Sequence, residues 1–129
     1  MTQPGTRYSA RVLELFRSLP RAGPLPAAPA GVAAAEATAL DRGAWVKFEA
    51  RVEAGRIVAC RFRAWGCPHT LAAAALAAGW LEGLPDGGST HCEAARLARE
   101  LDAPAEKMGR LLVVEDAARA LLAEAARVQ

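Results

Sequence analysis

The spacing of apolar residues predicts a helix followed by two paired strands in the first half of the chain. Between residues 8 and 19, apolar side chains recur every three or four positions, which indicates an amphipathic helix. Residues 45–53 alternate between apolar and charged side chains, as in a strand with one buried face. Ala54-Gly55 favours a tight turn, so residues 56–65 should run back beside the first strand. The buried face of that second strand should carry Val58, Cys60, Phe62 and Ala64.

The second half of the chain predicts helices. Residues 68–82 begin with a proline, which is common in a first turn. Thr90 and Glu93 have the spacing of a capping box that opens another helix. A last helix should turn inward Leu111, Leu112, Ala118, Leu121, Leu122 and Ala125.

Residues 32–40 leave two alternatives open. Their small side chains fit an edge strand, whereas the helix propensity of alanine favours a helix. In either case the order of elements is a helix, a small antiparallel sheet and several helices. That order predicts an α+β fold.

Length and charge narrow the possible functions. A chain of 129 residues is expected to form a single domain over residues 1–129. Its 16 basic and 14 acidic residues give a net charge of +2, so nucleic acid and membrane surfaces are not expected partners. The apolar run at residues 71–78 is too short to span a bilayer, and the first residues lack the pattern of a signal peptide. Three irregularly spaced cysteines argue against a disulfide framework and favour the cytoplasm.

Cys67 is the main candidate for chemistry. It lies where a strand breaks at Gly66 and a helix begins at Pro68. A thiol there meets backbone N–H groups and the positive end of a helix dipole, which lower its pKa. The alternative is a cysteine that only packs under the helix, as Cys60 is expected to do within the core.

Three further features are weaker candidates for a functional site. We expect His69 to be a first-turn surface residue near Cys67, where it could tune or ligate. A Cys2His2 zinc site would consist of Cys67, His69, His91 and Cys92. Adjacent helical residues such as His91 and Cys92 diverge by about 100°, however, so zinc is not expected. The tryptophans Trp45 and Trp65 are interpreted as core or rim packing rather than as a partner-binding patch.

Several segments resemble the IscU/NifU-type iron–sulfur cluster assembly scaffold family. The resemblance covers nearly the whole chain. It rests on Tyr8-Ser9, Pro20-Arg21-Ala22-Gly23, Arg61-Phe62 through Gly66-Cys67, Trp80-Leu81-Glu82-Gly83, Glu106-Lys107-Met108 and Glu115-Asp116-Ala117. It implies the IscU/SufE-like fold, a role in cluster assembly and a cysteine desulfurase as partner. The family's chaperone-recognition stretch falls on residues 103–107 and keeps only its first proline and its lysine, which argues against chaperone docking.

The ligand set departs from the family's pattern. Family members hold the cluster with three cysteines, aided by an aspartate or a histidine. Cys67 matches the second cysteine, whereas the first falls on Asp41 and the third on Arg110. A cluster needs four ligands, usually thiolates, and a guanidinium has no lone pair to give. Iron or an iron–sulfur cluster, if held at all, would therefore rest on Cys67 and Asp41.

These departures lead to two further expectations. Asp41 and Arg110 should form a salt bridge beside Cys67 that shapes the former cluster site, unless both are plain surface charges. The chain is then an impaired scaffold, a SufE-like acceptor that carries sulfur as a persulfide on Cys67, or a regulatory paralogue that docks on a desulfurase. The sequence does not determine the oligomeric state.

Overall fold

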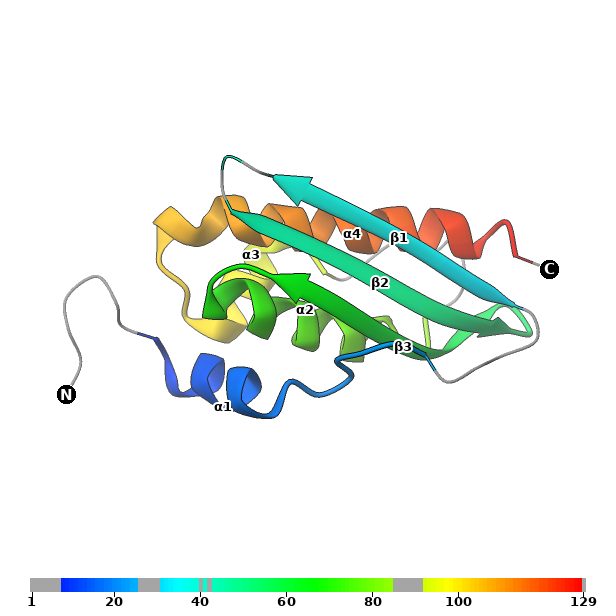
Figure 1. Ribbon diagram of the computed structural model, residues 1–129, viewed down its shortest axis with the longest axis horizontal. Helices are drawn as coiled ribbons and strands as arrows, with labels where there is room; N and C mark the ends of the chain where they lie inside the picture. Colours follow the sequence, from blue (N-terminus) through cyan, green and yellow to red (C-terminus); the bar gives the residue numbers. More distant parts are fainter. Residues whose placement is uncertain (1–7, 26–30, 40, 42, 85–91, 129) are drawn as a thin grey trace.

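A three-stranded antiparallel sheet lies against helices on one of its faces (Figure 1). The computed structural model describes residues 8–25, 31–39, 41, 43–84 and 92–128. The strands follow one another in the order β1-β2-β3, and helices α2 and α4 cover the sheet. This arrangement confirms the predicted α+β fold. The elements in chain order are α1 (Ala10–Ser18), β1 (Val32–Ala39), β2 (Ala44–Glu53), β3 (Arg56–Trp65), α2 (Pro68–Leu81), α3 (Ala94–Leu101), the 3₁₀ turn η2 (Ala105–Lys107) and α4 (Met108–Ala125).

Strand β1 resolves the ambiguous alanine-rich segment. It pairs with β2 along its whole length, from Val32 opposite Arg51 to Ala39 opposite Ala44. Helix α4 packs on its inner face. These long-range contacts outweigh the local helix propensity of alanine, which is worth only a fraction of a kcal/mol per residue, on the order of 0.5.

The hairpin of β2 and β3 forms as predicted, but a bulge changes one of its faces. Arg51 pairs with Ala59 while Val52 pairs with Ile57, so Val58 is an extra residue. Because the bulge shifts the alternation by one position, Ile57 is fully buried and Val58 is 42% exposed. The expectation that Val58 faces the core was therefore wrong.

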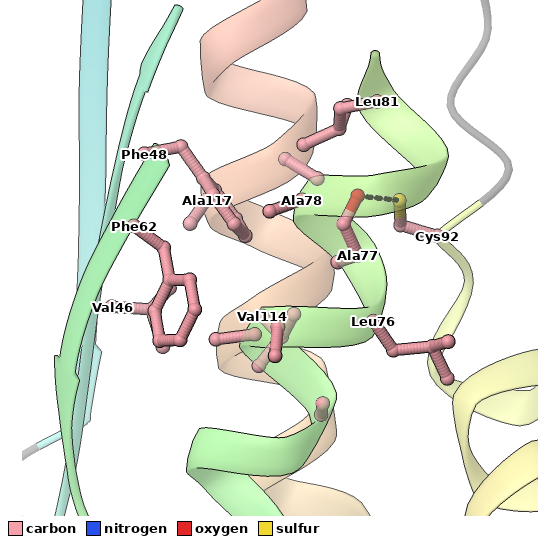
Figure 2. Close-up of a cluster of buried hydrophobic side chains, with 14 of the residues drawn as sticks. Val46, Phe48, Phe62, Leu76, Ala77, Ala78, Leu81, Cys92, Val114 and Ala117 are labelled. Carbon is pink, nitrogen blue, oxygen red and sulfur yellow. Dashed lines mark hydrogen bonds between the residues drawn. The ribbon is translucent and has the colours of Figure 1, made fainter. Parts of the chain in front are cut away.

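The core lies between the sheet and the two covering helices. In Figure 2, the rings of Phe48 and Phe62 on the sheet point toward α2 and α4. Most of the residues that α2 buries are alanines, whose small side chains allow close approach to the neighbouring elements. In α4 the helical period turns Val113 and Val114 inward and leaves Leu112 46% exposed, so the inward placement of Leu112 was wrong.

The carboxylate of Glu82, which follows α2, links the segment after α1 to strand β3 by hydrogen bonds. Its carboxylate accepts hydrogen bonds from Arg21 Nη2 at 2.8 Å and from the backbone N–H of Cys60 at 2.9 Å. Arg61 Nη1 lies 3.4 Å away. Burial alone would raise the pKa of Glu82, but the Arg21 hydrogen bond and the Cys60 N–H outweigh it and hold this pKa below its usual value.

Helix α3 is capped from another helix. It begins at Ala94 with Glu93 as the N-cap residue. The predicted capping box was therefore wrong in placing Glu93 at the third helical position. Thr90 of that box lies outside the described residues. Glu115 of α4 accepts a hydrogen bond from the Ala94 N–H at 2.8 Å. Among the described helices, none is both long and apolar enough to cross a membrane.

Candidate functional site

The turn between β3 and α2 requires glycine at position 66. Gly66 has a φ of +147°, which side-chain-bearing residues rarely adopt. A Cβ atom there would lie 2.9 Å from Thr70 Oγ1 and 3.1 Å from the carbonyl oxygen of Gly43. The β1–β2 turn, which includes Asp41 and Gly43, therefore packs against the turn that carries Cys67.

Cys67 is the N-cap residue of α2. Its backbone carbonyl accepts hydrogen bonds from the N–H groups of Thr70 at 2.9 Å and Leu71 at 3.2 Å. Its side chain makes no capping bond and is partly exposed. The Sγ atom lies 3.9 Å from Thr70 Oγ1.

The environment of this thiol favours the thiolate. Burial by itself would raise the pKa of Cys67, because an anion is costly to desolvate. The His69 side chain, the backbone N–H groups of Thr70 and His69, and the Thr70 hydroxyl more than offset burial. Together they lower the pKa of Cys67 from its ordinary value of 9.0 to about 6. The thiol is then mostly ionised at neutral pH, as the sequence predicted from its place at a helix start.

His69 lies beside Cys67 as expected, but it is not a surface residue. It is only 1% exposed, and the ring of Tyr8 packs against it with the two centroids 5.0 Å apart. Neither ring nitrogen has a hydrogen bond of standard geometry to a described residue. The imidazole is therefore a buried polar group directed at the site with spare hydrogen-bonding capacity.

Sequence reasoning did not identify two contributors to this site. Thr70 lies three residues after the N-cap, a spacing at which helix side chains return to the same face, so its position offered a signal. Tyr8 lies 61 positions before His69, and nothing local in the sequence indicated their contact.

The other two cysteines are core residues. Burial raises the pKa of Cys60 to about 12, which keeps it a thiol at physiological pH. Cys92 is fully buried, and its thiol points to the carbonyl oxygen of Ala77 at 3.8 Å (Figure 2). None of the three cysteines forms a disulfide. His91, the fourth member of the considered zinc set, lies outside the described residues.

The expected salt bridge between Asp41 and Arg110 is wrong. Within the described residues, no ion pair joins the two side chains. Asp41 is exposed on the β1–β2 turn, whereas Arg110 is partly buried on the first turn of α4 with its Nε unpartnered. Among the residues described, no group of three or more histidine, cysteine or acidic side chains is arranged to hold a metal ion.

Known proteins resemble this chain over nearly its full length. Residues 7–127 match the family described as NifU-like N terminal domain. The iron-sulfur cluster assembly enzyme IscU of Drosophila melanogaster is 28% identical over 122 residues, which are 94% of this chain and 79% of that protein.

Two solved structures share the fold. A putative iron-sulfur cluster assembly scaffold protein for the SUF system from Fervidobacterium islandicum has a TM-score of 0.69 at 14% identity. The match covers 89% of this chain and 96% of that one. The N-terminal part of a nitrogen-fixing NifU-like protein from Brucella abortus has a TM-score of 0.64 at 16% identity, covering 92% and 94% of the two chains.

Proposed function

Because the chain belongs to the NifU-like N-terminal domain family of iron–sulfur cluster assembly scaffolds, we propose that it serves cluster assembly as a sulfur acceptor on Cys67. Members of this family are generally non-catalytic scaffolds. The observation that carries the proposal is the environment of Cys67, a partly exposed thiol at a helix start with a lowered pKa.

The donor set argues against a standard scaffold. A cluster is the cargo of such a scaffold, and it needs four ligands that are mostly thiolates. The second family cysteine is present as Cys67, whereas Asp41 and Arg110 stand at the other two positions. A guanidinium carries no lone pair and repels iron. This chain therefore holds a cluster weakly or not at all.

Cys67 is suited to take up sulfur from a cysteine persulfide. Its thiolate attacks the outer sulfur of the donor's persulfide, and a new S–S bond forms as the donor's S–S bond breaks. The electron pair of the broken bond leaves with the donor's cysteine as a thiolate. No external oxidant or reductant is consumed, because the outer sulfur moves with its oxidation state unchanged.

By family resemblance, the donor is a cysteine desulfurase, which forms such a persulfide from cysteine. The reaction would take place in a reducing cytoplasm, where the three cysteines stay out of disulfides.

The test incubates the protein with a cysteine desulfurase and cysteine, then measures intact and peptide masses. We expect the peptide that contains Cys67 to gain the mass of one sulfur atom. The gain should disappear on mild reduction and in Cys67→Ser. Cys60→Ser serves as the matched control and should load normally, because Cys60 is buried.

Two results would contradict the proposal. Stoichiometric iron and sulfide after anaerobic reconstitution, without sulfur on Cys67, would identify a working scaffold. Binding to the desulfurase without either product would identify a regulatory paralogue.

A further inference from the structure

The outer edge of β3 is covered along most of its length. Other segments supply hydrogen-bond partners for backbone groups of β3 that point away from β2. The Ile57 N–H donates to the carbonyl of Leu84, and the Ile57 carbonyl accepts from the Gly83 N–H. The Cys60 N–H donates to the Glu82 carboxylate. At Phe62, the N–H donates to the carbonyl of Arg21, and the carbonyl accepts from the Gly23 N–H, both at 2.9 Å. The segment after α1 thus forms an isolated parallel β-bridge, with Ala22 beside Phe62.

This coverage stops at Ala64. Pairing with β2 is regular from Phe62 to Trp65, so Ala64 directs its N–H and C=O outward as Phe62 does. Within the described residues, neither backbone group of Ala64 has a hydrogen-bond partner. An unpaired stretch of strand edge is a template for another extended chain.

A hollow of about 340 Å³ opens beside this free edge. It is mostly apolar, and the charged residue in its wall is Arg63. The Arg63 guanidinium pairs with the Glu49 carboxylate at 3.5 Å, and nearly half of the Arg63 side chain stays exposed. The N–H of Leu71, which contributes to the hollow, donates to the carbonyl of Cys67, so one wall residue of the hollow lies one helical turn after Cys67. The other apolar side chains around it are those of Leu19, Ala22, Trp45, Phe62 and Ala64.

We propose that the Ala64 edge and the adjoining hollow bind an extended segment of the persulfide donor by strand addition. The segment's backbone pairs with the free N–H and C=O of Ala64, as residues 21–23 already pair with Phe62. One apolar side chain of the segment fills the hollow, and an acidic neighbour joins Glu49 at the exposed guanidinium of Arg63. Ala64 precedes Cys67 by three residues, at most roughly 10 Å of chain, so the donor's sulfur arrives at the thiol. This inference rests on the proposed function.

The test measures hydrogen exchange at the Ala64 amide in a complex that is unable to transfer sulfur. Cys67→Ser protein labelled with ¹⁵N is mixed with a purified cysteine desulfurase, and exchange is followed by NMR. We expect the Ala64 amide to exchange at least about tenfold more slowly in the complex, because strand addition gives it a hydrogen-bond acceptor. An unchanged rate in a saturated complex, or the absence of any complex, would overturn the proposal.

Surface variants provide matched comparisons in the same background. Ala22→Phe fills the hollow from an exposed position, and Arg63→Glu reverses its charge. Both should weaken binding of the desulfurase by about tenfold or more, which corresponds to about 1.4 kcal/mol. Ala123→Phe and Arg127→Glu, on exposed positions of the C-terminal region, should leave it unchanged. Equal losses in all four variants would contradict a site at this edge.

The experiment separates this inference from the proposed function. Protection of Ala64 in the complex, together with a wild type that never loads sulfur, would retain the docking edge and reject Cys67 as the acceptor. Sulfur loading that persists in Ala22→Phe at the wild-type rate would retain Cys67 as the acceptor and reject the docking edge.

Discussion

Three cysteines occupy different environments in this protein. Cys60 and Cys92 are fully buried, and burial raises the pKa of Cys60. Cys67 lies at the start of α2, where N–H groups and His69 compensate for partial burial. Reactivity should therefore be highest at Cys67, although none of the three residues is in a disulfide.

Replacing His69 tests the source of this reactivity. In the wild type, alkylation of Cys67 by iodoacetamide should reach half its maximal rate near pH 6, and it should fall as the pH drops below that value and the thiol becomes protonated. His69→Leu removes a contribution that lowers the pKa of Cys67, so the midpoint should move to higher pH. Mass spectrometry of the labelled peptide measures the rate at each pH.

His69→Gln is the matched control, since its amide can still donate a hydrogen bond and should give a smaller shift. A midpoint that is the same in His69→Leu as in the wild type would show that the helix start alone sets the thiolate. Circular dichroism would verify that both variants are folded.

At the scale of elements, the β2–β3 hairpin determines which side chains reach the core. Because apolar and charged residues alternate strictly in β2, its buried face could be predicted from the sequence. In β3 the extra residue at Val58 reverses the alternation between Ile57 and Cys60. A bulge leaves no consistent signature in a strand whose neighbouring residues are all apolar, as Ile57, Val58 and Ala59 are.

Two adjacent substitutions test this bulge. Ile57→Ala removes a fully buried side chain and should reduce the free energy of unfolding by about 2–5 kcal/mol. Val58→Ala trims an exposed side chain and should change it by no more than about 0.5 kcal/mol. Urea denaturation of the two variants measures both values. A larger loss for Val58→Ala than for Ile57→Ala would show that the strand has the unbulged register.

At the scale of the whole molecule, the fold brings together two turns far apart in the sequence. The β1–β2 turn with Asp41 contacts Gly66 through Gly43, next to Cys67. Arg110 lies in the first turn of α4 and has no ion pair with Asp41. The charges at these two positions therefore do not neutralise each other.

Cluster content is the measurement at this scale. After anaerobic reconstitution with iron and sulfide, the wild type should hold far less than one [2Fe–2S] cluster per chain, because too few thiolates are present. The double variant Asp41→Cys/Arg110→Cys restores the family's ligand types and should bind more iron and sulfide. Arg99→Cys, an added cysteine on α3, is the control for a thiol elsewhere. A full cluster in the wild type would contradict the proposed loss of scaffold function.

The amino-acid sequence by itself determined the order of most elements, the hairpin and the candidate thiol. These features depend on local signals: apolar periodicity, a turn dipeptide, and a Gly-Cys-Pro junction between strand and helix. The family could also be recognised from the sequence, because its motifs are short and contiguous.

Only the tertiary structure decided the strand at residues 32–39, the bulge at Val58, the burial of His69 under Tyr8 and the free edge at Ala64. Each depends on contacts between residues far apart in the chain or on the register between strands. Local propensities amount to about 1 kcal/mol per residue or less, and such contacts readily outweigh them.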